Sequence, residues 1–471
     1  MTNHSEDELA YLSIGEAGRL LRRGEISTLD LVNTTLARIE RWNPELNAFL
    51  TVVAKRARRE ARIVERETRR GKWRGPLHGI PISLKDNFWT RGIRTTAGSK
   101  ILADFIPKRD SEVAARLAKA GAILLGKTNM HEFAYGITTE NPHYGPAHNP
   151  WAKDRISGGS SGGSAIAVAT GMGFGSFGTD TGGSIRIPAA LCGVVGLKPT
   201  FGLVSVAGVV PLAETFDHAG PIARGVTDAC ISLQAVAREH PKGTTTPDYR
   251  KLRLNNLRGV RLGWPKQYFF DHVDAELQSL FEAAARSFRP LGARVDEVSL
   301  KLPSESANPS TNIALAEATH YHQAQGYFPS RAADYGEDVR RRLELGENVR
   351  AVDYLRALAW KRQLTNEFDA AFERFDAILA PASPIPAPSI GEKEVMVAGV
   401  VETVRSALVR VNRPANFTGH PAISIPCGFT RVGLPAGLQL IGPRWGEQRL
   451  LSIALAYEEA TEWHKRHPAL T

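Results

Sequence analysis

Two clusters that mix glycine with hydroxyl residues are the part of this sequence best suited to chemistry. Ser157–Ser164 runs SGGSSGGS and Thr181–Ser184 runs TGGS, with small and apolar residues between them. Glycine adopts backbone conformations closed to other residues and lets the chain approach a ligand closely. A serine hydroxyl can attack a carbonyl carbon, and unpaired backbone N–H groups can hold the oxyanion that forms. The pattern therefore indicates a hydrolase that forms a covalent intermediate on serine.

Two other interpretations of these clusters are weaker. Gly/Ser runs often form flexible linkers, but apolar segments that belong in a core follow both clusters, at Ala165–Ala169 and Ile185–Leu197. Glycine-rich loops also bind phosphate, yet the chain lacks G-x-x-x-x-G-K-[S/T] and has no G-x-G-x-x-G that opens a strand–helix unit with a suitable acid downstream. A non-catalytic glycine-rich binding protein is the most remote alternative.

A histidine base and a bound metal are the rival sources of chemistry. None of the thirteen histidines stands in the G-x-S-x-G context of a histidine-assisted serine. His143 and His148 lie in a polar loop rich in proline, and His320 and His322 point apart on a helix. The chain contains no H-E-x-x-H and no C-x-x-C. We therefore expect no metal and no other cofactor.

Together with other segments, the two clusters make the chain resemble the amidase signature family. The matching segments are Gly79–Asn87 (GIPISLKDN), Ser157–Ser164, Gly178–Arg186 (GTDTGGSIR), Gly193–Thr200 (GVVGLKPT), Pro421–Pro426 (PAISIP) and Gly433–Gln439 (GLPAGLQ). The likeness spans most of the chain and is strongest from about residue 76 to residue 211. It implies an amidase that cleaves a carboxamide C–N bond through an acyl-enzyme and releases ammonia or an amine.

The resemblance also implies a catalytic triad of Ser184, Ser160 and Lys85. Ser184 would be the acylated nucleophile, and Ser160, on a cis peptide bond, would relay its proton to a neutral Lys85. The oxyanion hole would be formed by the backbone N–H groups of Thr181, Gly182, Gly183 and Ser184. A lysine with its reference pKa of about 10.4 is a poor base at neutral pH. Burial disfavours the charged form, and the apolar run Ile80–Leu84 before Lys85 fits such burial.

The substrate pocket is harder to place, because in this family it is shaped by residues outside the motifs. We expect a small amide substrate to contact Met130, Phe133, Ser161 and Phe216. Tyr135, the helix around 312–322 and the loop 389–412 would form the rest of the wall. Asp180 and Arg186, on either side of the second cluster, would orient the loop or form a simple structural ion pair.

A second function within the same family stays open. The A subunit of a tRNA-dependent amidotransferase shares the triad and acts as a glutaminase. That subunit has a segment with tyrosine and aspartate before its Asn-Phe-Thr-Gly motif, which is 416–419 here, whereas this chain has Val395–Val401 (VMVAGVV). The departure favours a stand-alone amidase. The sequence leaves open whether partner subunits exist and whether the chain is a homodimer.

The composition favours a globular protein without a nucleic-acid or membrane partner. The 471 residues carry 59 Lys and Arg against 49 Asp and Glu, a net charge of +10. The basic run Lys55–Lys72 includes glutamates, which is typical of a solvated helix face. No apolar run reaches the roughly 18 residues of a membrane span. The N-terminal residues 1–8 are polar, and three distant cysteines (Cys192, Cys230 and Cys427) suit reduced thiols, so we expect a cytoplasmic location.

The order of apolar and polar residues predicts an α/β fold with a mixed, largely parallel central sheet covered by helices on both faces. The first 70 residues or so are predicted to be helical, with capping-box spacing after Ser13 and Ser27. Helices and β-branched runs then alternate, as in Arg258–Trp264, Asp274–Phe288 and Ala293–Val295. Residues 310–375 are predicted to be helical, and a buried strand follows. No linker divides the chain, so we expect one domain over residues 1–471.

Overall fold

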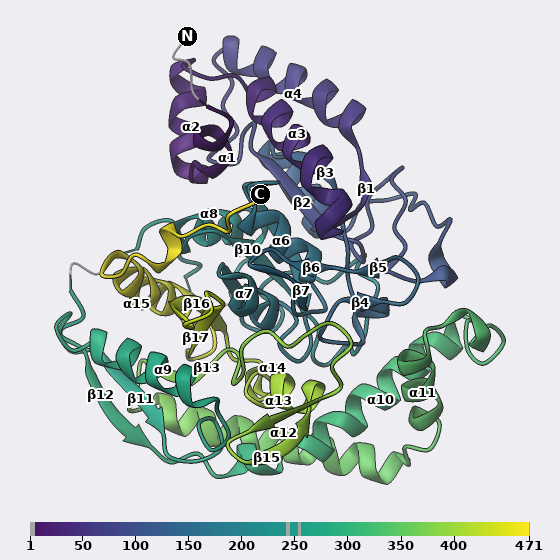
Figure 1. The fold of residues 1–471 in the computed structure, drawn as a ribbon, viewed down its shortest axis with the longest axis vertical. Helices are drawn as coiled ribbons and strands as arrows, with labels where there is room; N and C mark the ends of the chain where they lie inside the picture. The colour runs from purple at the N-terminus through teal and green to yellow at the C-terminus, as the bar shows by residue number, and fades with distance from the viewer. Residues whose placement is uncertain (1–4, 242–244, 253–255, 471) are drawn as a thin grey trace.

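One sheet of eleven strands forms the centre of the molecule (Figure 1). The computed structural model describes residues 5–241, 245–252 and 256–470, so the first four residues of the predicted helical N-terminus lie outside the described residues. In spatial order the strands are β1 (Phe49–Val52), β3 (Ile123–Thr128), β2 (Pro81–Lys85), β8 (Gly175–Asp180), β10 (His218–Ala223), β9 (Val195–Lys198), β16 (Ala422–Phe429), β17 (Pro435–Ile441), β13 (Ala377–Pro381), β11 (Arg261–Pro265) and β12 (Arg294–Val298).

The sheet is mixed, as the sequence predicts, but the expectation that it is largely parallel is wrong. Strand β2 is parallel to β3 and β8, and β11 is parallel to β12 and β13. The other neighbouring pairs of this sheet are antiparallel. A parallel pair needs a crossover, usually a helix. Helices α5 (Glu112–Ala120) and α9 (Ala275–Ser287) supply it, whereas β16 and β17 are joined by a short turn and so form a hairpin.

The N-terminal region is helical, as predicted, apart from the edge strand β1. Helices α1 (Glu6–Tyr11), α2 (Ile14–Arg23), α3 (Thr28–Leu46) and α4 (Ala54–Arg69) gather at one end of the molecule (Figure 1). Both predicted capping boxes are present: Ser13 pairs with Glu16 before α2, and Ser27 pairs with Asp30 before α3. Each box satisfies orphan N–H groups at a helix start, so these helices begin where the sequence places them.

Helices cover both faces of the sheet. Successive residues of a strand point to opposite faces, and the neighbours Leu124 and Leu125 of β3 accordingly belong to two different hydrophobic clusters. The cluster of Leu124 contains α8 (Val226–Val236), and that of Leu125 contains α6 (Gly162–Ala169). The prediction of helices on both faces is therefore confirmed.

A group of three helices at the opposite end from α1–α4 corresponds to the region predicted to be helical over 310–375 (Figure 1). These are α10 (Ala307–Ala324), α11 (Glu337–Gly346) and α12 (Ala351–Phe372). The remaining helices are α7 (Arg186–Cys192), α13 (Val404–Arg410), α14 (Arg413–Thr418) and α15 (Glu447–Glu459), and the remaining strands are β4 (Glu140–Asn141), β5 (Gly145–Pro146), β6 (His148–Asn149), β7 (Ala152–Ile156), β14 (Glu394–Val397) and β15 (Val400–Thr403). The segment 389–412, expected as a loop, thus contains the hairpin β14–β15 and helix α13.

Candidate active site

The parallel pair β2 and β8 brings the two halves of the predicted triad to one edge of the sheet. Leu84 of β2 lies opposite Phe177 of β8, so the carboxyl ends of both strands meet. Lys85 is the last residue of β2, and β8 ends at Asp180, directly before the second Gly/Ser cluster. The first cluster begins directly after β7, and its last three residues form the start of α6. Segments far apart in the sequence are therefore held next to each other by strand pairing.

Lys85 and Ser160 are in direct contact, as the resemblance implies. The Lys85 Nζ lies 2.7 Å from the Ser160 Oγ and 2.7 Å from the Thr179 Oγ1. The peptide bond between Gly159 and Ser160 is cis. Lys85 is completely buried, and burial lowers its pKa from 10.5 to about 7, although the charges of Asp180 and Asp217 oppose that shift. A substantial fraction of Lys85 is therefore neutral at physiological pH.

Ser184 lies between the end of β8 and the start of α7, where it lines a cavity of about 240 Å³. Its carbonyl oxygen accepts a hydrogen bond from the Ser161 N–H over 3.3 Å, which ties the two Gly/Ser clusters together. In the described chain no hydrogen bond links the hydroxyls of Ser160 and Ser184. The structure thus joins Lys85 to Ser160 and places Ser184 at the cavity, but it shows no direct bond that completes the triad.

The loop before Ser184 offers backbone donors to the cavity, but one of the four expected donors is already used. The Gly183 N–H donates to the Asp180 carboxylate over 2.8 Å. The N–H groups of Thr181, Gly182 and Ser184 donate to no residue that the structure describes. Gly183 has φ 119°, and a Cβ there would lie 2.7 Å from Asn412. Of the four donors expected to form an oxyanion hole, the other three are therefore free of partners among the described residues, and Gly183 shapes the loop.

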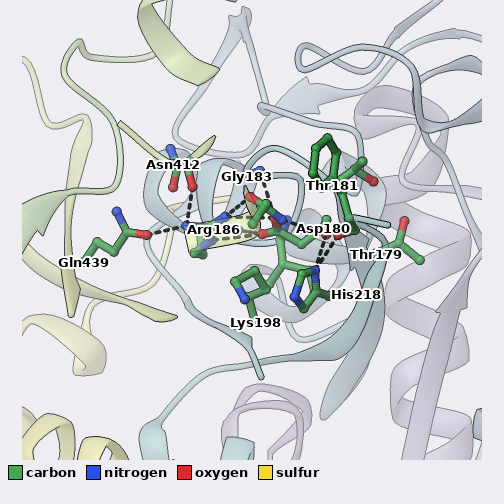
Figure 2. A network of polar contacts seen from close by, with 12 residues as sticks. Thr179, Asp180, Thr181, Gly183, Arg186, Lys198, His218, Asn412 and Gln439 are labelled. Atoms are coloured by element: carbon green, nitrogen blue, oxygen red, sulfur yellow. Dashed lines mark hydrogen bonds and ion pairs between the residues drawn. The ribbon is translucent and has the colours of Figure 1, made fainter. Parts of the chain in front are cut away.

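A buried ion pair holds this loop in place (Figure 2). Arg186 donates to both oxygens of Asp180, from Nη2 over 2.9 Å and from Nε over 3.0 Å, and both side chains are completely buried. Figure 2 shows Arg186 between Asp180 and Gln439, whose side-chain oxygen also accepts from it. Burial alone would raise the pKa of Asp180, but the charge and hydrogen bonds of Arg186 hold it below its usual range. Asp180 is thus an ionised acceptor that orders the loop through Gly183 and Ile185.

Part of the expected pocket wall lines the cavity. Phe216 and Tyr135 line it, as do Thr311, Ala314 and Leu315 of α10 and Arg405 and Val409 of the segment 389–412. Three residues expected to contact the substrate do not line it. Met130 and Phe133 are buried in the core beside the cavity, where Phe133 packs edge-on against His322. Ser161 is buried, and its hydroxyl donates to the Thr179 carbonyl. Apolar residues next to a motif look alike in sequence whether they face a core or a pocket.

Sequence reasoning missed three arginines that line this cavity: Arg342, Arg405 and Arg413. Arg342 belongs to a run of three arginines that reads as a solvated helix face, and the other two stand alone in their segments. No spacing or motif marks any of them, because the cavity forms only when α11, α13 and α14 pack around the nucleophile loop.

Metal sites and membrane spans bear on the expected cofactors and partners. Among residues 5–241, 245–252 and 256–470, no group of three or more His, Cys, Asp or Glu side chains is placed to hold a metal ion. None of the described helices combines the length and the apolar character needed to cross a membrane.

Comparison with known proteins agrees with the motifs. A family model described as Amidase matches residues 30–451. The chain is similar to the A subunit of the glutamyl-tRNA(Gln) amidotransferase of Geotalea daltonii, with 40% identity over 98% of this chain and 100% of that protein. It is also similar to a chain solved for a vestigial protein complex that reveals the evolutionary origins of an s-triazine catabolic enzyme (TM-score 0.90, 33% identity, 95% of this chain and 98% of that one). The solved structure of an amidase is similar as well (TM-score 0.88, 36% identity, 95% and 99%). The chain therefore belongs to the amidase signature family.

Proposed function

We propose that this protein hydrolyses a carboxamide through an acyl-enzyme on Ser184. The observation that carries the proposal is a buried lysine with a pKa of about 7 that contacts Ser160. The next residue, Ser161, donates its N–H to the carbonyl of Ser184, which lines the cavity. A neutral amine can accept a proton that a protonated lysine cannot. Lys85 is suited to act as the base, and Ser160 to pass the proton to it.

The reaction follows from these positions. The Ser184 oxygen attacks the amide carbon, and its proton moves through Ser160 to Lys85. The carbonyl oxygen becomes an oxyanion that accepts hydrogen bonds from Thr181, Gly182 and Ser184. The C–N bond then breaks, and the proton held by Lys85 goes to the departing nitrogen, which leaves as ammonia or an amine. Water attacks the ester on Ser184 by the same proton route, which releases the carboxylic acid and restores the serine.

A second candidate is the glutaminase component of a tRNA-dependent amidotransferase. The names of the similar curated proteins favour it over a stand-alone amidase, since relatives such as those of Geotalea daltonii and Moorella thermoacetica are amidotransferase A subunits with 40% identity. Both candidates share the chemistry on Ser184. They differ in whether the chain acts alone and in whether glutamine is the amide.

The compartment is part of the same proposal. All three cysteines are buried and unpaired, and burial raises the pKa of each thiol, which makes them poor nucleophiles. Free thiols in an enzyme of this size suit a reducing environment, which supports a cytoplasmic location.

The test is ammonia release by the purified chain. The chain alone is assayed with a panel of aliphatic and aryl carboxamides and with glutamine, and then again with amidotransferase partner subunits and tRNA. Release by the chain alone supports the stand-alone amidase, and release from glutamine only in the complete mixture supports the second candidate. Ser184→Ala is the control, and a fluorophosphonate probe should label the unchanged chain but not this variant. No release in either setting, with no labelling, would overturn the proposal.

A further inference from the structure

The cavity in front of Ser184 has a strongly positive wall. Its lining includes Arg342, Arg405 and Arg413, and no aspartate or glutamate of the described chain lines it. The rest of the wall is largely apolar, with Leu212, Phe216, Leu315 and Phe417 among its members. Charged groups in an apolar cavity are costly unless they are paired, so three cations without a lining anion call for an explanation.

The charge of Arg342 is explained by its partners within the protein. Its Nη1 donates to the Asp338 carboxylate over 2.9 Å and also to the Tyr135 carbonyl. Asp338 is engaged a second time by His131, whose Nε2 lies 3.1 Å away. Arg342 is therefore part of a structural network that fixes α11 beside the cavity.

Arg405 and Arg413 have no such partner. Neither guanidinium makes a hydrogen bond or an ion pair with any residue that the structure describes, although each is only half-exposed. Burial and the nearby charges of Arg342 and Arg413 lower the pKa of Arg405, and burial lowers that of Arg413. The groups that oppose this lowering at Arg405 are Tyr135 and Asp338, and Asp338 is already paired with Arg342.

Their positions in the helices give no local reason for these cations. Arg405 is the second residue of α13 and Arg413 is the first residue of α14. Positive charges stabilise the C-terminal end of a helix and are unfavourable at its start. An anion arriving in the cavity would relieve both guanidinium groups, and a carboxylate matches the fork of N–H donors on arginine.

We propose that the substrate of this cavity is a small amide that also carries a carboxylate, which Arg405 and Arg413 bind while the amide lies at Ser184. The inference rests on the proposed function, whose substrate class it narrows. A cavity of about 240 Å³ is below the range of roughly 300–1,000 Å³ typical of drug-sized ligands, so a short monoamide of a dicarboxylic acid fits it. Glutamine fits less well, because the lining offers its ammonium group no carboxylate.

Binding is measured by calorimetry in the Ser184→Ala background, where turnover does not interfere. The probes are succinamate and glutaramate, each compared with the neutral amide in which an isopropyl group replaces the carboxylate, together with 4-aminobutanamide, glutamine and inorganic phosphate. A hydrogen bond to a charged group contributes about 1.5–3 kcal/mol, so at least one carboxylated probe should bind about tenfold or more tighter than its neutral partner.

The variants test which residues give that preference. Arg405→Gln and Arg413→Gln should each reduce it about tenfold, whereas Arg341→Gln, which removes an exposed charge of α11 outside the cavity, should leave it unchanged. Arg413→Lys keeps the charge but not the fork and should fall between the two. If one glutamine variant does not fold, the other still decides, because the two arginines are on separate helices.

The outcomes separate this inference from the proposed function. The inference would be overturned if a carboxylated amide and its neutral counterpart bound with equal affinity. It would also be overturned if both arginine variants kept the preference for the carboxylated amide, or if phosphate bound as tightly as the carboxylated amides. If the unchanged protein hydrolyses only neutral amides, the inference fails and the catalytic proposal stands. If carboxylated amides bind selectively but no amide is hydrolysed, the inference stands and the catalytic proposal fails.

Discussion

Replacing Lys85 with methionine should change the pH dependence of stability, independently of any substrate. The pKa of Lys85 falls from 10.5 to about 7 in the folded protein, because the side chain is completely buried. Each pKa unit corresponds to about 1.4 kcal/mol, so carrying the charged form into the fold costs about 5 kcal/mol. Methionine has a similar length and no charge, and it does not carry this cost.

The direction in which the free energy of unfolding changes with pH follows from proton binding. Between about pH 7 and 10.5 the unfolded chain holds a proton on Lys85 that the folded protein has lost, so the free energy of unfolding rises with pH. The cost is fully present below pH 7 and disappears as the pH approaches 10.5. Relative to Lys85→Met, the unchanged protein should gain about 2 kcal/mol of stability between pH 7 and pH 9.

The measurement is urea unfolding of both proteins at several pH values from 7 to 9, followed by tryptophan fluorescence. The difference between the two proteins isolates Lys85, because the other buried lysines, such as Lys127 and Lys198, are present in both. Asp217, with a pKa raised by burial to about 6, titrates below this window. Lys119→Met removes an exposed lysine of α5 and serves as the control for loss of a positive charge.

Two results would refute the reasoning. If the two stability curves run parallel between pH 7 and 9, Lys85 keeps its proton in the folded protein and cannot be the base. If Lys119→Met shows the same divergence as Lys85→Met, the effect comes from net charge and not from burial. In the unchanged enzyme, the rate of amide hydrolysis should rise with pH through about 7.

Three further substitutions test the site. Ser184→Ala should lower turnover by about a thousandfold or more with an unchanged melting temperature, and residual normal turnover would exclude this nucleophile. Gly183→Ala should lower both the melting temperature and the rate, because its Cβ would lie 2.7 Å from Asn412 at φ 119°; a stable, active variant would contradict that steric argument. Asp217→Asn should move the acid limb of the rate profile to lower pH, since the charge of Asp217 raises the pKa of Lys85, and a shift to higher pH would show that the assumed sign is wrong.

The local parts of the fold could be predicted from the sequence. The capping boxes at Ser13 and Ser27 and the strand–helix–strand unit from β11 to β12 depend on neighbours in the chain, and all appear as predicted. The direction of the other strands depends on which segments pair across the sheet. The antiparallel strand β10 between β8 and β9 carries no short-range signal, and neither does the pairing of the hairpin β16–β17 with β9 and β13, so the sheet is less parallel than predicted.

The candidate site also has one part that the sequence predicts and another part that it does not. The motifs predict that Lys85 and Ser160 lie together, and these residues meet at 2.7 Å. The apolar character of Met130 and Phe133 suggests a place in the pocket, but the structure buries both in the core. Arg405 and Arg413 carry no signal in the sequence, because what distinguishes them is that neither has a partner among the residues that the structure describes. A motif reports residues that must be near each other, whereas a pocket wall is decided by packing.

The buried ion pair also bears on the chemistry of Lys85. The charges of Asp180 and Asp217 both favour the protonated lysine, whereas burial favours the neutral form and has the larger effect. Arg186 binds the Asp180 carboxylate with two hydrogen bonds and leaves its oxygens able to accept from Gly183. The Asp180 carboxylate thus orders the loop before Ser184 and also raises the pKa of Lys85. A change in how Asp180 is held would therefore alter both the conformation of this loop and the protonation of Lys85.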